Sequence, residues 1–178
     1  GTVTGVQTCA LPISSFYDEK YYTSSNYSNY LDRSERYHSL ASELFDAMSK
    51  LGLVFKDDVI LDYGCALGFL MEGISTLGYR NVCGYDVSEW AQESAKQRGL
   101  SVLDSPSPCD VMIALDVFEH MEDLEINKAI LACPKGPAAS AVCVMRMSPI
   151  ICCPTSLLRS LDANSGVCWI SKHKLSSS

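Results

Sequence analysis

Apolar residues recur along the chain with a helical period in its first third. The stripe predicts an amphipathic helix over residues 33–51, with Gly52 as a typical end. Asp32 and Glu35, three positions apart, have the pattern of a capping box at its start. The preceding residues 16–30 are rich in Tyr, Ser and Asn and show no clear period, which predicts a loop or a loose cap.

Further along, short aliphatic and β-branched runs alternate with helical stripes. The runs predict strands over residues 59–61, 81–85, 100–103, 110–115 and 141–147, and the stripes predict helices over residues 69–77, 89–98 and 122–132. Gly78 would end the first of these helices, and Ser88 would be the N-cap of the second. Strands that alternate with helices form parallel sheets with right-handed crossovers. The pattern therefore predicts an α/β fold with a doubly wound, mostly parallel sheet.

Composition and charge narrow the class of partner. The chain has 178 residues, of which 47% are hydrophobic and 20% charged, as in packed globular domains. Its net charge is -7, and no stripe of Lys or Arg is present to neutralise a phosphate backbone, so bulk charge argues against a nucleic acid partner. No segment reaches the roughly 20 apolar residues that cross a bilayer, which argues against a membrane partner.

Nine cysteines raise the question of disulfides and metal sites. No segment resembles a signal peptide and no two cysteines form a CxxC pair, so buried or free thiols of a cytoplasmic protein are the favoured interpretation. The adjacent Cys152 and Cys153 give no two-pair zinc pattern, and we expect no metal site. The oligomeric state is open.

The N-terminus has an unusual sequence. Residues 3–13, VTGVQTCALPI, resemble the conceptual translation of a common sequencing adapter. We expect residues 1–14 to be a non-native leader from a metagenomic fragment, with a genuine strand as the alternative. Residues 15–52 then form an N-terminal cap and helix, and residues 53–178 the main domain.

Acidic residues follow the predicted strands. Asp62, Asp86, Asp104 and Asp116 each lie at or near the carboxyl end of a strand. Ligands of open α/β sheets bind at this edge, near the point where the strand order reverses. Asp is also common in turns, but four in succession predict a site.

The loop from Asp62 to Gly68 contains small residues that let a backbone approach a ligand closely. A dinucleotide site requires G-x-G-x-x-G, and reading from Gly64 places Ala66 and Phe69 where the second and third glycines belong. An NAD-dependent oxidoreductase is therefore a remote alternative.

Three blocks of the sequence resemble class I S-adenosylmethionine (SAM) dependent methyltransferases. The loop DYGCALG resembles motif I, with Ala66 in place of the middle glycine. The block GYDVSEWA carries Asp86, where family members hold both ribose hydroxyls of SAM, and CDVMIALDVFEH resembles the fourth strand and the turn after it. The resemblance implies the Rossmann-like methyltransferase fold and SAM as cofactor.

The resemblance also assigns roles to single residues. The residues implied to bind SAM are Asp62, Gly64, Cys65, Ala66, Gly68, Asp86, Val87, Asp104, Asp116 and Val117. Among them, Gly64, Cys65 and Gly68 would line the methionine and ribose, Asp86 and Val87 the ribose and adenine edge, and Asp104 the adenine amino group. Asp116 and Val117 would lie beside the sulfonium.

The remaining assignments concern catalysis and access. His120 is the candidate general base, because the unperturbed pKa of histidine, about 6.5, is near the working pH. A capping role for Glu119 and His120 is the structural alternative. Tyr22 and Tyr30 would belong to a lid over the cofactor or to a polar leader, and we expect Trp90 to be a packing residue.

The predicted activity is methyl transfer from SAM to an O, N or C nucleophile of a small molecule. Residues 148–178 match the family's substrate region only loosely, and we expect the chain to end before the usual final antiparallel hairpin. A truncation or a frameshift within residues 135–178 would explain this. A SAM-binding fragment without turnover is thus the alternative to an active enzyme.

Overall fold

The computed structural model describes residues 17–23, 33–117, 121, 142–146, 159–162 and 167–171. Its helices are α1 (Glu19–Thr23), α2 (Ser34–Lys50), α3 (Phe69–Thr76) and α4 (Glu89–Gln97). Its strands are β1 (Val59–Tyr63), β2 (Asn81–Tyr85), β3 (Val111–Leu115), β4 (Val142–Arg146), β5 (Arg159–Asp162) and β6 (Val167–Ser171). None of the helices in these ranges is long and apolar enough to cross a membrane.

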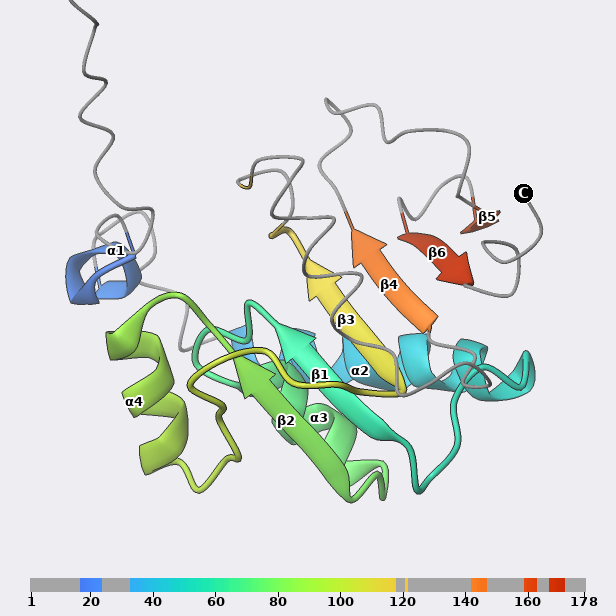
Figure 1. Cartoon of the computed structure of the whole chain (residues 1–178), viewed down its shortest axis with the longest axis horizontal. Coiled ribbons are helices and arrows are strands. Elements are labelled where there is room, and N and C mark those ends of the chain that lie inside the picture. Colours follow the sequence, from blue (N-terminus) through green and yellow to red (C-terminus); the bar gives the residue numbers. More distant parts are fainter. Residues whose placement is uncertain are drawn as a thin grey trace, which may run out of the picture.

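The described strands form one sheet in the order β2-β1-β3-β4-β6-β5 (Figure 1). The strands from β2 to β4 are parallel to their neighbours, as predicted from the alternating pattern. β6 is antiparallel to β4, and β5 is antiparallel to β6. The expectation that the final antiparallel hairpin is missing is therefore wrong. The run Val167–Ser171 contains β-branched and aromatic residues that favour a strand.

One predicted strand differs from the observed structure, and one predicted helix is not tested. The strand over residues 100–103 is a single bridge between Gly84 and Val102. The chain leaves the sheet after Leu103, and the prolines at positions 106 and 108 lack the N–H group that a ladder needs. The helix predicted over residues 122–132 lies outside the described residues.

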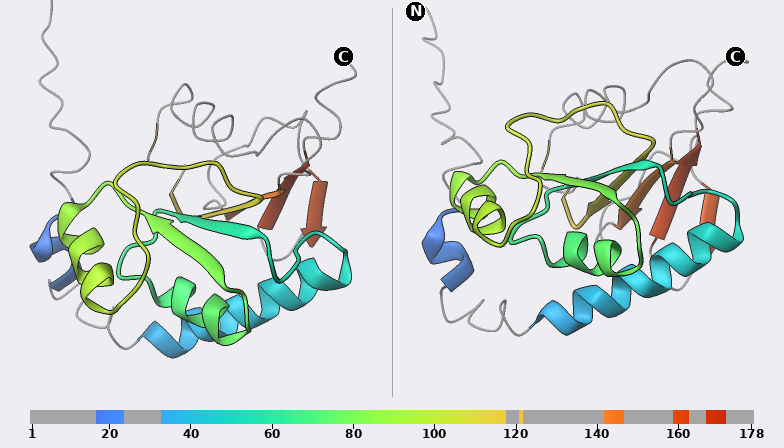
Figure 2. Two further views of the ribbon diagram at one scale, coloured as in Figure 1. Left: turned by 60° about the horizontal axis from the view of Figure 1, so that its bottom comes forward. Right: turned by 90° about the horizontal axis from the view of Figure 1, so that it is seen from below.

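The helices α2 and α3 cover one face of the sheet (Figure 2). Their contact is close, because a Cβ at Gly73 of α3 would lie 2.9 Å from the Cβ of Ala41. The core on this face combines residues of both helices with strand residues, among them Phe45, Met48, Leu70, Ile74, Ile60 and Ile113. On the other face, Leu61, Tyr63, Met112 and Ala114 pack with Cys109.

The boundaries of α2 follow the prediction only in part. The N-cap is Arg33, whose side chain makes no capping hydrogen bond, and Asp32 of the predicted capping box lies outside the described residues. The other end is confirmed: Gly52 has a φ of 67°, and the Leu53 N–H donates to the Met48 carbonyl at 2.9 Å.

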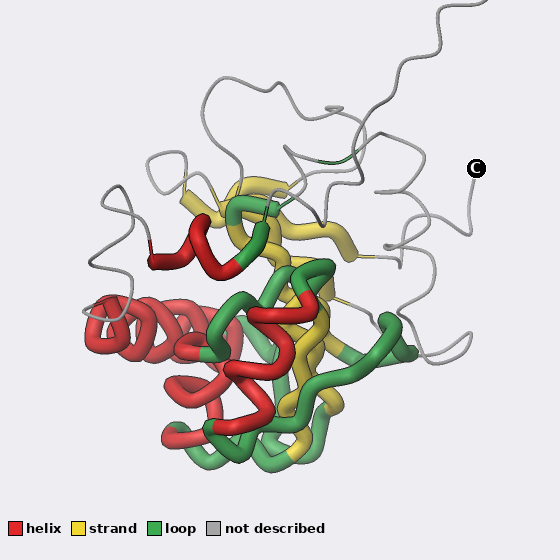
Figure 3. The backbone as a smooth tube through the Cα atoms, turned by 90° about the vertical axis from the view of Figure 1, so that its left-hand side faces the viewer, coloured by secondary structure: helices red, strands yellow, loops and turns green. Residues whose placement is uncertain are grey.

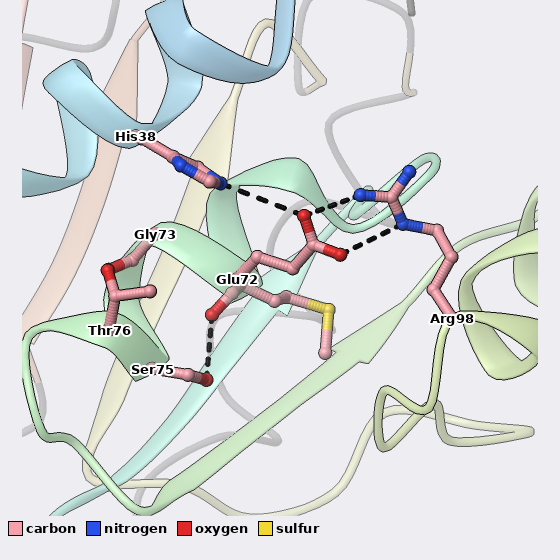
Figure 4. Close-up of polar contacts among 7 residues, drawn as sticks. His38, Glu72, Gly73, Ser75, Thr76 and Arg98 are labelled. Atoms are coloured by element: carbon pink, nitrogen blue, oxygen red, sulfur yellow. Dashed lines mark hydrogen bonds and ion pairs between the residues drawn. The ribbon is translucent and has the colours of Figure 1, made fainter.

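An ion-pair cluster joins the helices on this side (Figure 4). Glu72 of α3 accepts hydrogen bonds from Nε of Arg98, at 3.0 Å, and from its Nη2. The His38 Nε2 of α2 lies 3.7 Å from the Glu72 Oε2, and the Arg98 guanidinium stacks over the Phe69 ring at 4.2 Å. One carboxylate therefore links α2, α3 and the end of α4.

Two hydrogen bonds hold the beginnings of β1 and β3 together. The Asp110 N–H donates to the Val59 carbonyl at 2.8 Å, and the Asp110 Oδ2 accepts from the Val59 N–H at 2.8 Å. Ile60 then pairs with Val111, so the register of the two central strands is set at this end.

Candidate functional site

The strand order reverses beside β1. The chain passes from β1 to β2 on one side and then returns to β3 on the other side of β1. Ligands of open α/β sheets bind at the carboxyl ends of the strands at such a point. Asp62, Asp86 and Asp116 all lie at or just beyond these ends, as predicted.

Two glycines allow the loop after β1 to approach its neighbours. Gly64 and Gly68 both have a φ of 82°, in the left-handed region. A Cβ at Gly64 would lie 2.3 Å from the Val117 Cγ2, and one at Gly68 would lie 2.1 Å from the Leu100 Cδ1. The N–H groups of Gly64 and Cys65 donate to the Tyr85 carbonyl at 2.7 and 3.0 Å, which ties the loop to the end of β2.

Two residues other than glycine share this left-handed conformation. Ala66 has a φ of 46°, so the position of the missing middle glycine keeps a backbone that favours glycine. Asp116, directly after β3, has a φ of 56°. Such conformations cost about 1 kcal/mol or more and gather at functional sites.

Asp86 is a buried acid held by backbone donors. It is 6% exposed, and its Oδ2 accepts from the Ala66 N–H and its Oδ1 from the Ser88 N–H, each at 2.8 Å. Burial raises the pKa of Asp86, and the hydrogen bonds from Ser88 and Ala66 oppose that shift. Each carboxylate oxygen has a second lone pair, so the group can accept two further hydrogen bonds.

Asp62 is the second buried acid of the site. It is 4% exposed and pairs in register with Gly84, two residues before Asp86. Burial, and after it the charge of Asp86, raises the pKa of Asp62 to about 7. Among the described residues, no hydrogen-bond donor reaches its carboxylate. A buried carboxylate in this state favours a cationic partner.

The segment around α1 lies over this end of the sheet, beside α4 (Figure 3). Tyr22 is buried, and its ring stacks on Trp90 with centroids 5.3 Å apart. Burial and then the charge of Asp86 raise the pKa of Tyr22, which places the two groups in the same region. Trp90 is thus a packing residue, as expected, while the role of Tyr22 as a lid stays a prediction.

The Cys65 thiol is buried. Burial, followed by the charges of Asp62 and Asp86, raises the pKa of its thiol, so the thiol stays protonated. In the parts of the chain that the structure describes, no three His, Cys, Asp or Glu residues gather to hold a metal ion.

Two of the remaining predicted site residues are exposed, and two lie outside the described residues. Asp104 accepts from the Lys96 Nζ at 3.2 Å, and its side chain is 91% exposed. Val87 is 38% exposed and follows Asp86 directly. His120 and Tyr30 lie outside the described residues. The adenine contacts and the general base therefore stay predictions.

The sequence interpretation missed the polar partners of Asp86. Ser88 was predicted only as the N-cap of α4, a role confirmed by the Ala91 N–H that donates to its Oγ at 3.2 Å. The Gln92 Nε2 donates to the Asp86 carbonyl at 2.6 Å. Asp often accepts from the backbone N–H two residues later in an Asx turn, and this pattern would have located the bond from the Ser88 N–H to Asp86.

Comparisons with known proteins agree on the class. A family model described as a methyltransferase domain matches residues 33–143, and no curated protein matches significantly. The fold is similar to that of magnesium protoporphyrin IX methyltransferase from Synechocystis PCC 6803 with bound SAM, with 16% identity, 78% coverage of both chains and a TM-score of 0.52.

A second solved structure is the plantazolicin methyltransferase BpumL in complex with S-adenosylhomocysteine (SAH). It has 24% identity and a TM-score of 0.53, and the match covers 75% of this chain and 56% of BpumL. This chain therefore spans little more than half of that enzyme. The family match takes in more than half of the chain and runs from α2 into β4. Together with the fold, it shows that the chain belongs to the SAM-dependent methyltransferases of class I.

Proposed function

We propose that the chain binds SAM at the strand ends around Asp62, Gly64 and Asp86 and transfers its methyl group to a small molecule. One observation carries the proposal: two buried carboxylates lie at the ends of β1 and β2, beside a loop that its glycines fold tightly. When bound, SAM supplies an activated methyl group on a cationic sulfur. Buried negative charge next to a close backbone approach suits such a cofactor.

Each buried acid has a separate role in the proposal. The two unused lone pairs of the Asp86 carboxylate accept the ribose hydroxyls, while its backbone donors keep it in place. The Asp62 carboxylate, which no described donor reaches, offers its charge to the cationic part of the cofactor. Val87 and Asp104 supply the adenine side, and Asp116 and Val117 the side of the reacting methyl group.

The chain accelerates the reaction chiefly by alignment. Fixing the nucleophile, methyl carbon and sulfur in line contributes up to about 7 to 11 kcal/mol in favourable systems. An acceptor hydroxyl or carbon acid also requires a base, and we propose His120, which follows β3 by five positions.

The acceptor class is inferred from the net charge of the protein, which argues against a nucleic acid, and from the two similar solved structures. The two similar structures are named for magnesium protoporphyrin IX and plantazolicin, which are not nucleic acids. We infer a small-molecule acceptor with an O, N or C nucleophile and a cytoplasmic location. The alternative of a SAM-binding fragment without turnover relied on a missing hairpin, and β5 and β6 remove that reason.

Calorimetric titration with SAH tests the cofactor site. Asp86→Asn keeps the shape of the side chain but loses its charge and one acceptor oxygen, so we expect SAH to bind about 10- to 100-fold more weakly. Asp46→Asn, on the exposed side of α2, is the matched control and should bind as the wild type does. Equal affinities of the two variants would refute the site.

Transfer of a labelled methyl group tests turnover. We expect the wild type to label a member of a small-molecule acceptor pool, and His120→Ala to lower the rate with little change in SAH affinity. A folded wild type that binds SAH but labels nothing in broad pools would support the fragment alternative.

A further inference from the structure

Ser88 makes hydrogen bonds in three directions and is 1% exposed. Its N–H donates to the Asp86 Oδ1 at 2.8 Å. Its Oγ accepts from the Ala91 N–H at 3.2 Å, and the same hydroxyl donates to the Tyr17 carbonyl. A helix cap needs only the acceptor of a serine hydroxyl. The donor is used on a residue 71 positions away, and this second use has no part in capping.

The Tyr17 contact brings the N-terminal segment, residues 17–23, to the cofactor site. Within that segment, Tyr22 is buried against Trp90, which lies two residues after Ser88. Tyr17 and Tyr21 pack edge to face at 4.8 Å, so the aromatic residues of the segment form one unit. The segment therefore docks through a hydrogen bond at Ser88 and a ring stack at Trp90.

Asp86 and the N-terminal segment thus share one residue. If the segment leaves, the Ser88 hydroxyl loses its main-chain acceptor, and with it the contact that fixes this side chain from the side of the N-terminal segment. Without that contact the turn from Asp86 to Ser88 is held from one side fewer. A shift of the turn would move the Ser88 backbone N–H that holds the Asp86 carboxylate.

We propose that Ser88 is a positioning residue that couples docking of residues 17–23 to the orientation of Asp86, and so to cofactor affinity. The inference rests on the proposed function of Asp86. Coupling between two binding events is reciprocal. SAH binding should therefore strengthen the docking of the N-terminal segment.

Two variants separate capping from coupling. Ser88→Gly removes the hydroxyl, yet glycine is a tolerated N-cap that costs only a few tenths of a kcal/mol relative to serine. Ser88→Thr keeps both the acceptor and the donor. We expect Ser88→Gly to weaken SAH binding about three- to tenfold in calorimetry, and Ser88→Thr to restore most of the affinity.

A double-mutant cycle with Tyr22→Leu tests whether the effect passes through the N-terminal segment. Tyr22→Leu removes the ring stack on Trp90, so the segment docks poorly and Ser88→Gly should then change the SAH affinity by less than about twofold. The same fold-loss in both backgrounds, or no loss in Ser88→Gly alone, would overturn the coupling.

Fluorescence without cofactor provides an independent readout. In a Trp169→Phe background, which leaves Trp90 as the only tryptophan, acrylamide should quench Ser88→Gly more strongly than the parent. SAH should protect the parent. Unchanged quenching in Ser88→Gly would overturn the inference, whereas a folded parent that binds no SAH would refute the proposed function as well.

Discussion

At the scale of single residues, the fold buries the side chains of Asp62 and Asp86 at the carboxyl ends of the adjacent strands β1 and β2. Burial works against the charge of each, and the Asp86 charge adds to the effect on Asp62. The two acids differ in their partners: Asp86 accepts from two backbone N–H groups, while no described donor reaches Asp62. Asp62 is therefore the group whose ionisation responds most to a bound cation.

The pKa of Asp62 predicts how stability depends on pH. It is about 7 in the folded state against about 3.9 in an unfolded chain, so between these values the folded state holds a proton that the unfolded state has lost. The raised pKa stabilises the fold at low pH, and this contribution is lost as the pH rises towards 7. We expect the free energy of unfolding to fall by about 2–3 kcal/mol between pH 5 and pH 8.

Urea unfolding at the two pH values measures this change. Asp62→Asn should remove most of the dependence, while the surface control Asp46→Asn should keep it. Asp86, whose pKa is also raised, contributes in the same direction. An identical slope in Asp62→Asn and the wild type would show that Asp62 is ionised in the folded state. SAM affinity should rise with pH through the same window, because the cation favours the ionised form.

At the scale of elements, the site depends on how closely the loop after β1 approaches the end of β3. Gly64→Ala would place a methyl group 2.3 Å from the Val117 Cγ2 and force alanine into a left-handed backbone. We expect a loss of about 2–4 kcal/mol in urea unfolding. Adding Val117→Ala should recover part of the loss, and no recovery would mean that the backbone alone sets the cost.

We expect the ion pair between Arg98 and Glu72 to contribute more to the free energy of unfolding than the ion pair between Lys50 and Asp46. Arg98 binds the carboxylate with two nitrogens and stacks on Phe69, so Arg98→Lys should cost about 1 kcal/mol of stability. The pair between Lys50 and Asp46 is exposed, and Lys50→Met should change stability by less than about 0.5 kcal/mol. Urea unfolding of both variants checks this, and equal losses would contradict it.

The same elements show what a sequence can predict. The parallel strands were predictable because their apolar runs are short and end in acids, and Gly52, Gly78 and Ser88 marked helix ends correctly. The contact between Ser88 and Tyr17 was not predictable. It uses a main-chain carbonyl, which every residue has, across 71 positions of sequence. The bond from the Ala66 N–H to Asp86, which spans 20 positions, carries no local signal in the sequence either.

At the scale of the whole molecule, β6 covers the edge of β4 and β5 extends the sheet beyond it. An uncovered strand edge presents a row of unpaired N–H and C=O groups that favours association. We expect a chain ending at residue 147 to unfold at lower urea concentration and to associate in light scattering. A chain lacking residues 1–14 is the control and should keep the stability of the full chain. Equal behaviour of the two truncations would contradict a role for the hairpin.

The pair of hydrogen bonds between Asp110 and Val59 has a consequence for how such a chain can change. Because these bonds set the register anew where β3 begins, the connection over residues 104–108 can gain residues without moving Asp116 relative to Asp62. Insertions there would alter the surroundings of Asp104, on the proposed adenine side, and leave Asp62 and Asp116 in place. This connection is therefore the natural position at which evolution, or a protein engineer, can graft a new recognition loop.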